Sequence, residues 1–527
     1  MSEYSNNTEN LQNLIDIGLA LSKEKNIDKL LEKILVEARR ISNSDGGTLY
    51  LMIDDNTRLS YNIMHTDSKS IYYGGSHESV PDSIYPVKLY KDGKPNMHNA
   101  CVVCAIKGET INIKDAYSDD KYDFSGTKGF DSKYNYYSKS FLNVPLKNHK
   151  NTVIGVLQLL NAQDNNNNII SYSKDLVHLV ESLASQASIA LTNQLLIEEQ
   201  KNLFKSFIQL VAEALEKKDK TTGGHCTRVP LITMMVAEAI NNDTSSKYLN
   251  FTFNEDEMEE LYVAGWLHDF GKVSTPEYIM NKSTKLEGLY DKIEFIKMKL
   301  EILKRDKEIE FYKKSLNPKC ENNLNEISDK IDKDISFLEE CNIGVEFMNS
   351  AYKEKVKEIA KEKIKIGGKE RNLLTDKEIE YLSISKGTLS KEDFVIMKQH
   401  VELTYELLDK LPYPQHLKKV PFYAGCHHEK INGEGYPNGY SGDKLPLQAR
   451  IIAIADVFEG LTAPDRPYKK GYKLSKAMNI LRDMAKGNEI DVDLFNLFIK
   501  QKIYLKYAES SINQSQIDFI DEEKMLI

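Results

Sequence analysis

The stretch AGWLHDFGKV, residues 264 to 273, places a histidine and an aspartate side by side in an otherwise apolar run. Lys272 follows Asp269 by three residues and His268 by four, so on a helix all three side chains share one face. An imidazole and a carboxylate can ligate a metal together, and an adjacent lysine can hold a phosphate oxygen. Alone, the triplet also fits a hydrogen-bonded structural pair at the edge of a core helix.

Residues of the same kinds recur at four other places, each in an apolar or glycine-rich setting. They are His225 in TTGGHCTRV, His400 in EDFVIMKQHVELTYELL, His427 and His428 in YAGCHHEKINGEGYPNGYSG, and Asp456 in ARIIAIADVFEGL. An ionised aspartate in so apolar a helix is costly without a partner, and a metal is a common compensation. Five histidines and two aspartates are enough donors for two divalent ions.

Composition limits the classes of partner. The 527 residues predict about three folding units. With 70 Lys+Arg against 79 Asp+Glu, the net charge of −9 offers no global basic field for DNA or an anionic membrane. The first residues show no signal peptide and no 18-residue apolar run occurs, so we expect a soluble cytoplasmic protein. Six cysteines in so long a chain indicate reduced thiols rather than a disulfide framework.

Three segments organise the chain. Residues 10–195 mix helical and strand-like patterns and predict an α+β unit. Residues 173–222 lack an internal break and predict a connecting helix about 70 Å long, which either packs on its own domain or pairs with a second copy as a parallel coiled coil. Residues 283–342 carry two apolar seams separated by SLNPKCENN and predict an antiparallel helical hairpin. The seams are Leu286, Leu289, Ile293, Ile296, Leu300 and Leu303, then Leu324, Ile327, Ile331, Ile335 and Leu338.

HDFGK, HHEKINGEGYPNGYSG and IADVFEGLTAPDRPYKKGY together resemble the HD-GYP family of HD-domain metal phosphohydrolases, which cleave cyclic di-GMP. The resemblance implies an all-α helical bundle over residues 217–510, with the 283–342 hairpin inserted between Lys272 and His400. It also implies a bound pair of divalent metal ions, for which we expect iron or manganese.

The resemblance assigns a role to each motif residue. It implies that Asp269 and Lys272 are catalytic, with Asp269 bridging the ions and Lys272 on the scissile phosphate. Arg466 and Lys469 would hold the rest of the dinucleotide, and the Gly435-Tyr436-Pro437 loop would shape the pocket. The metal ligands implied are His225, His268, Asp269, His400, His427, His428 and Asp456.

Three positions depart from the family pattern. Thr221 stands where members with a third metal have glutamate, which favours two ions. Asn432 replaces the usual aspartate of the glycine-rich stretch, and Thr404 replaces a common glycine after His400.

The N-terminal unit resembles GAF sensor domains through INIKDAYSDDKYDFSGTKGFD and YYSKSFLNVPLKNHKNTVIGVLQLLNAQD. Such domains bind small molecules or chromophores, and many only dimerise, so we expect a small-molecule ligand of this domain and a homodimer. His98, Cys101 and Cys104 lie close in sequence, and surface or packing roles are favoured over metal or redox roles.

The expected function is a metal-dependent phosphodiesterase, regulated by the GAF domain, that hydrolyses the 3′,5′ linkage of cyclic di-GMP to linear pGpG and/or GMP. One alternative is hydrolysis of another cyclic dinucleotide or nucleotide. Another is a signalling scaffold that binds a ligand without turnover. The presence of all seven metal-ligating residues and of Lys272 argues against this alternative.

Overall fold

The computed structural model describes residues 2–218, 224–244, 247–314, 321–344, 347–464 and 471–527. The chain forms two compact units, with the boundary between Leu203 and Phe204. Among the described residues, no helix combines the length and the apolar composition needed to cross a membrane.

An antiparallel sheet with strand order β3-β2-β1-β9-β8-β7 forms the centre of the N-terminal unit. Side chains on both faces of its central strands are buried, as expected of a sheet covered on two sides. Short strands β4 and β10 extend the sheet at β2 and β9, and β5 pairs with β6. The strands are β1 (Ser44–Ile53), β2 (Arg58–Thr66), β3 (Ile71–Tyr73), β4 (Val87–Lys88), β5 (Tyr90–Lys91), β6 (Lys94–Pro95), β7 (Ile111–Ile113), β8 (Phe141–Lys147), β9 (Val153–Gln163) and β10 (Ile169–Ile170).

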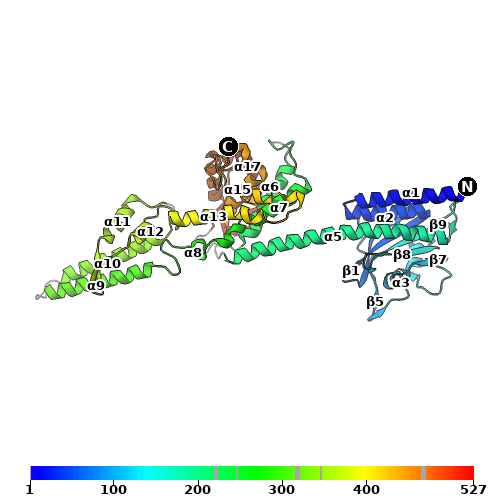
Figure 1. Ribbon diagram of the computed structural model, residues 1–527, viewed down its shortest axis with the longest axis horizontal. Helices are drawn as coiled ribbons and strands as arrows, with labels where there is room; N and C mark the ends of the chain where they lie inside the picture. Colours follow the sequence, from blue (N-terminus) through cyan, green and yellow to red (C-terminus); the bar gives the residue numbers. More distant parts are fainter. Residues whose placement is uncertain (1, 219–223, 245–246, 315–320, 345–346, 465–470) are drawn as a thin grey trace. The chain divides into compact units, whose positions relative to one another are not determined.

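Helices cover both faces of this sheet (Figure 1). α1 (Ser2–Lys23), α2 (Ile27–Ser42) and the first part of α5 (Lys174–Lys218) share one apolar cluster with β1, β8 and β9. α3 (Ala100–Lys107) packs on the opposite face, and α4 (Ser125–Tyr134) precedes β8. The α+β architecture expected of the N-terminal unit is confirmed.

The C-terminal unit is largely helical and is built around α15, a helix whose buried residues are mostly apolar. α6 packs on α15 and α7, and α13 packs on α14 and on the 3-10 turn η2 (Phe270–Ser274). The last part of α5 joins this core through Ile208 and Ala212. The helices are α6 (His225–Asn241), α7 (Glu255–Leu267), α8 (Glu277–Met280), α13 (Lys391–Leu408), α14 (Val420–Ala424), α15 (Leu447–Thr462), α16 (Leu474–Lys486), α17 (Val492–Lys500), α18 (Ile503–Ser511) and α19 (Glu522–Met525).

The connecting helix is present as α5, which ends at Lys218; the last residues of the predicted range, 219–223, lie outside the described residues. Its two ends bury apolar side chains in different cores, because Val180, Leu183 and Leu191 belong to the N-terminal cluster and Ile208 to the C-terminal one. The chain thus passes from one unit to the other in helical conformation.

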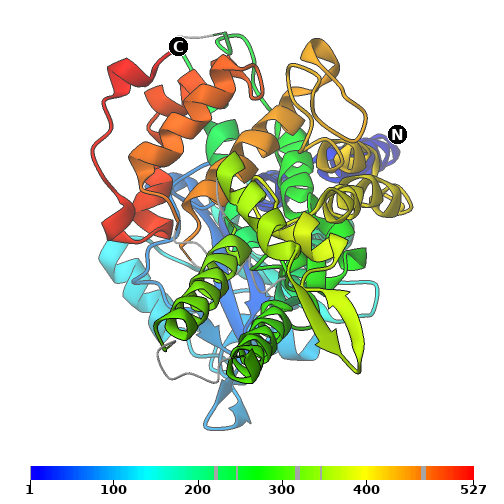
Figure 2. The same ribbon diagram turned by 90° about the vertical axis from the view of Figure 1, so that its left-hand side faces the viewer.

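The predicted helical hairpin is formed by α9 (Ile293–Lys314) and α10 (Glu321–Asn342), which Figure 2 shows side by side and nearly end-on. The prediction was wrong at its start. Leu286 is buried but precedes the helix, and Leu289 lies in a turn with 97% of its surface exposed. The seam therefore begins at Ile293, since Glu287 and Asp291 form a bridge in this turn instead of continuing a helix.

Further elements extend the inserted segment beyond Asn342. α11 (Ser350–Ala360), α12 (Asp376–Leu382) and the ribbon of β11 (Lys363–Ile366) and β12 (Lys369–Asn372) share an apolar cluster with the hairpin. The ribbon, seen in yellow-green in Figure 2, was not predicted. Its turn has positive φ at both Gly367 and Gly368. A Gly-Gly pair between two strands is the sequence feature that indicates a two-residue hairpin loop.

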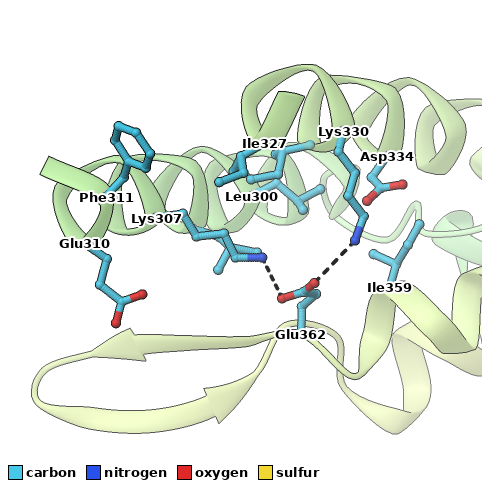
Figure 3. A pocket seen from close by; sticks show the side chains of 11 residues that line it. Leu300, Lys307, Glu310, Phe311, Ile327, Lys330, Asp334, Ile359 and Glu362 are labelled. Carbon is cyan, nitrogen blue, oxygen red and sulfur yellow. Dashed lines mark hydrogen bonds and ion pairs between the residues drawn. The ribbon is translucent and has the colours of Figure 1, made fainter. Parts of the chain in front are cut away.

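A cavity of about 430 Å³ lies between α9, α10 and the segment before β11 (Figure 3). Leu300, Ile327 and Ile359 form its apolar wall. At its edge, Glu362 pairs with Lys307 at 2.9 Å and with Lys330 at 3.8 Å. These ion pairs tie both helices of the hairpin to the chain entering the ribbon.

The hairpin seam can be tested with a pair of substitutions. Ile296→Ala removes a fully buried side chain, so we expect a loss of about 2–5 kcal/mol in local stability. Leu289→Ala removes an exposed one and should change stability by less than about 0.5 kcal/mol. Hydrogen exchange of the α9 and α10 amides in the full chain measures both. Equal protection in the two variants would contradict the observed seam.

Candidate metal centre

The structure brings together all seven residues that the sequence singled out as metal ligands. His225 opens α6, and His268 and Asp269 lie where α7 passes into η2. His400 lies within α13, His427 and His428 follow α14, and Asp456 lies within α15. Their side chains form two groups with Asp269 between them.

The first group consists of His225, His268 and Asp456, whose ligand atoms lie within 4.8 Å of one another. The Nε2 atoms of the two histidines are 3.2 Å apart. The distance from His225 Nε2 to Asp456 Oδ1 is 3.4 Å. Asp269 adds its Oδ2, at 3.4 Å from His225 Nε2 and 3.3 Å from His268 Nε2.

The second group consists of His400, His427 and His428, again with ligand atoms within 4.8 Å. Asp269 turns its other oxygen to this group, because its Oδ1 lies 3.4 Å from His400 Nε2 and 3.7 Å from His427 Nε2. One carboxylate therefore faces both groups, one oxygen to each.

Hydrogen bonds orient the imidazoles toward the centre. The Nδ1 of His268 donates to the carbonyl of Gly265 at 2.8 Å, that of His400 to Met397 at 2.5 Å, and that of His427 to Ala424 at 2.6 Å. With the proton on Nδ1, each Nε2 presents a lone pair to the centre. This is the arrangement found in metal-binding histidines.

The donor set fits divalent cations. The buried Nε2 atoms of His400 and His427 have no hydrogen-bond partner, although such atoms are normally satisfied. Donors around one ion at ordinary metal–nitrogen and metal–oxygen distances lie about 3.0–3.4 Å apart. The first group shows separations of 3.2–3.4 Å between His225 and its neighbours. Its atoms therefore need little rearrangement to surround an ion.

Charges in the centre are strongly perturbed. Burial acts to raise the pKa of Asp269, but the Lys272 ammonium, whose Nζ lies 2.7 Å from Asp269 Oδ2, and His268 hold that pKa well below its ordinary value. Burial and the neighbouring His428 lower the pKa of His427 well below its usual range. An ionised carboxylate and a neutral imidazole are the forms that bind metals.

Glu459 is a functional residue that sequence analysis missed. It is fully buried and its Oε2 accepts from His225 Nδ1 at 2.5 Å, while Arg228 donates to its Oε1 from Nε at 2.8 Å. Burial opposes ionisation, but the bonds from His225 and Arg228 lower its pKa to about 2. Glu459 therefore orients His225 as an outer carboxylate. The indication was available, because it follows Asp456 by three residues in the same apolar helix.

Thr404, one of the three positions that depart from the family pattern, has a structural role. Its hydroxyl accepts from the backbone N–H of Gly271 at 2.8 Å and donates to the carbonyl of His268 at 3.1 Å. α13 approaches so closely here that a Cβ on Gly271 would lie against the His400 carbonyl. Thr404 thus fixes His268 against the helix that carries His400.

The glycine-rich loop is held by a second buried carboxylate that sequence analysis missed. Glu429 accepts from the backbone N–H groups of Asn438 at 2.7 Å and Tyr440 at 3.0 Å. A Cβ on Gly435 would meet the Glu429 backbone at 2.5 Å, so the close approach requires glycine. Asn432, the second departure, bonds within the loop by accepting from the Glu434 N–H at 3.0 Å.

The loop places Tyr436, with Pro437 after it, beside the second histidine group. Its ring lies 5.0 Å from that of His428, and Lys398 Nζ lies 4.7 Å from its centroid. An aromatic ring and an ammonium at the edge of the centre suit a base and a phosphate. The predicted substrate residues Arg466 and Lys469, and the departure Thr221, fall outside the described residues.

Family comparisons agree with this geometry. Sequence models described as HD domain match residues 222–335 and 377–494, and one described as GAF domain matches residues 26–191. The chain carries a GAF domain followed by an HD domain. The recognition of these two domain types from the motifs is confirmed. HD domains are metal-dependent hydrolases, in keeping with the two histidine groups.

Curated relatives are similar over parts of the chain. The 3′3′-cGAMP-specific phosphodiesterase 1 of Vibrio cholerae is 33% identical over 134 residues, 25% of this chain and 30% of the relative. The cyclic di-GMP phosphodiesterase response regulator RpfG of Xanthomonas campestris is 37% identical over 98 residues, 19% and 25% of the two chains. The cyclic di-GMP phosphodiesterase PA4108 of Pseudomonas aeruginosa is 43% identical over 115 residues, 22% and 26%. The chain thus spans less than a third of each of these relatives.

The thiols of the GAF domain suit packing rather than reactivity. Cys101 and Cys104 lie in an apolar cluster under the sheet, with exposures of 4% and 0%. Burial raises the pKa of the Cys101 thiol to about 12. Neither residue, nor His98, belongs to a cluster of metal-ligating side chains among the described residues.

Glu459 offers a test of how the HD centre holds metal. Glu459→Gln keeps the shape of the side chain but removes the charge that orients His225, so we expect metal affinity to fall about 10–100-fold. Asp483→Asn, an exposed carboxylate on α16 of the same unit, is the matched control and should bind metal like the parent. Metal content of protein equilibrated with graded chelator gives the affinity. Unchanged affinity in the Gln variant would remove Glu459 from the site.

Proposed function

We propose that the HD domain is a two-ion phosphodiesterase that hydrolyses the 3′,5′ linkage of a cyclic dinucleotide, with cyclic di-GMP as the substrate. The observation that carries the proposal is the position of Asp269, one carboxylate facing two histidine groups with Lys272 against it. The ligands would be His225, His268 and Asp456 for one ion and His400, His427 and His428 for the other, with Asp269 shared. Iron or manganese suits this set of imidazoles and carboxylates without thiolates.

Bound divalent ions supply Lewis acidity toward phosphate oxygens and lower the pKa of water. Asp269, ionised because of Lys272 and the histidines, accepts a hydrogen bond from the attacking water and so orients it. Lys272 keeps 21% of its side chain exposed, and its ammonium can contact the scissile phosphate and neutralise the charge that develops there. A first cut gives linear pGpG, and a second cut gives GMP.

Similar proteins support the substrate class. The relatives above are named for cyclic di-GMP or 3′3′-cGAMP, which share the 3′,5′-linked dinucleotide ring. On this chain, Tyr436 would stack on a base and Gly435 and Pro437 would shape the loop around it. Arg466 and Lys469 would hold the second phosphate through charge.

The GAF domain would regulate this activity through α5 in response to a small molecule, and the chain would act as a homodimer. Support for the dimer comes from α5, where large apolar side chains are exposed at a spacing of seven residues. They are Ile189, Leu196, Leu203 and Leu210, with exposures of 59%, 47%, 70% and 64%. This spacing is typical of a parallel coiled-coil seam.

A nucleotide panel tests the substrate. Full-length protein loaded with Mn²⁺ or Fe²⁺ should convert cyclic di-GMP to pGpG or GMP faster than it converts 3′3′-cGAMP, 3′,5′-cyclic GMP or linear pGpG. The products are separated by chromatography. Faster turnover of 3′3′-cGAMP would keep the reaction and change the substrate, whereas no turnover of any compound by metal-loaded protein would contradict the proposal.

A substitution at Lys272 distinguishes a role in catalysis from a role in metal binding. Lys272→Met removes the ammonium but no metal ligand, so we expect metal content to be retained while kcat falls about 10²–10³-fold. A His268→Ala/Asp269→Ala variant should lose both metal and turnover. Lys398→Met, which removes an ammonium beside Tyr436, is the matched control and should change KM more than kcat. Full activity in Lys272→Met would exclude a role on the phosphate.

A further inference from the structure

A third group of metal-ligating side chains lies in the GAF domain. Glu32 on α2, His65 on β2 and His77 in the turn after β3 place one ligand atom each within 4.8 Å of one another. The three residues come from three separate elements, and none belongs to the GAF motifs identified in the sequence.

The turn that carries His77 is built to approach α2. Gly74 and Gly75 adopt φ angles of +80° and +66°, which side chains rarely adopt, and the His77 N–H donates to the Gly74 carbonyl at 3.1 Å. A Cβ on Gly75 would lie 2.6 Å from Glu32 Oε2, so the approach also requires glycine there. His65 enters from the sheet, where it pairs with Tyr72 on β3.

The donor atoms are oriented as ligands. Ser76 donates its N–H and its hydroxyl to Glu32 Oε2 at 2.8 and 2.7 Å, which holds the carboxylate and leaves Oε1 facing His77 Nε2 at 3.5 Å. Donors of one tetrahedral ion are about 3.3 Å apart, so this pair already has the spacing of two ligands. Tyr72 packs on both imidazoles, with ring centroids 5.2 Å from His65 and 5.4 Å from His77.

An unsatisfied buried nitrogen points to a ligand. His65 is 3% exposed, and its Nε2 has no hydrogen-bond partner. A buried polar atom of this kind is costly unless something satisfies it. Arg39, a cation whose charge acts on His65, is already paired, since its Nη2 lies 2.6 Å from Asp67 Oδ2. The local charge therefore leaves Glu32 free to balance an ion.

We propose that Glu32, His65 and His77 bind a single divalent transition-metal ion in the GAF domain. Two imidazoles and one carboxylate are a ligand set for zinc or ferrous iron, and three protein ligands leave a coordination position open. His77 is 43% exposed while His65 is buried, so the site is reached from solvent on the His77 side. The ion would join α2 to the β2–β3 edge of the sheet and stabilise the domain by binding its folded form.

Cobalt(II) is a suitable probe, because its visible absorption reports the ligands directly. The parent for the test is the full chain carrying His268→Ala/Asp269→Ala, which weakens the HD centre. We expect the parent to bind about one equivalent of Co²⁺ more than the same chain without the GAF site, with a tetrahedral or five-coordinate spectrum for that equivalent. Adding His77→Ala should weaken this binding at least about tenfold, and Glu32→Gln, which keeps the acceptor for Ser76, should do the same.

A matched control makes the result decisive. His178→Ala removes an exposed histidine that also pairs with a glutamate, Glu181, in the same domain, and it should leave Co²⁺ binding unchanged. Co²⁺ should also raise the unfolding temperature of the parent and of His178→Ala, but not that of His77→Ala, with circular dichroism showing that all three fold. Equal Co²⁺ binding in His77→Ala and His178→Ala would overturn the proposal, whatever metal remains in the HD centre. The outcome is independent of phosphodiesterase activity, so failure of one proposal does not decide the other.

Discussion

The carboxylate of Asp269 is the group on which the C-terminal unit depends. A buried anion surrounded by four imidazoles and one ammonium can persist only because these groups compensate its charge. Each group lies in a helix or in the turn that follows one, and these elements must be held in place. The two hydrogen bonds of Thr404 and the missing side chain of Gly271 bring α13 against η2. Glu459 of α15 holds α6 in place by pairing with both His225 and Arg228 of that helix. The packing of the bundle and the shape of its centre are thus determined together.

Much of this centre could be predicted from sequence, because an ionisable residue in an apolar helix indicates compensation whatever the fold. This reasoning identified Asp456, and it applies equally to Glu459, which lies in the same apolar helix but was not predicted. Glu429 is different. Its role is to accept two backbone N–H groups from a loop nine and eleven residues ahead, and such a bond has no side-chain pattern in the sequence. A residue such as Glu429, which binds only backbone, therefore leaves no side-chain pattern from which its role could be predicted.

The GAF cluster shows the same limit in another form. Cys101 and Cys104 are neighbours in sequence, and they are buried packing residues, one of the roles favoured from the sequence. Glu32, His65 and His77 are far apart in sequence and become neighbours only through strand pairing and a turn with two glycines. The hairpin seam was likewise extended too far, since the spacing of Leu286 and Leu289 fits a helix while the chain there forms a turn. The spacing of apolar residues predicts which side chains a helix could bury, but it does not predict where the helix begins.

The insertion raises the question of how a site divided in sequence by more than a hundred residues keeps its geometry. The base of the insertion supplies an answer. Lys282, just before it, and Asp393, just after it, form an ion pair of 2.7 Å with side-chain exposures of 3% and 8%. The Lys282 ammonium also lies 4.1 Å from the centroid of Tyr381, and Lys285 donates to the Ile384 carbonyl at 3.0 Å. These contacts join the segment that enters the insertion to the segment that leaves it, within or just before the first turn of α13. The helix that carries His400 therefore begins from a fixed point.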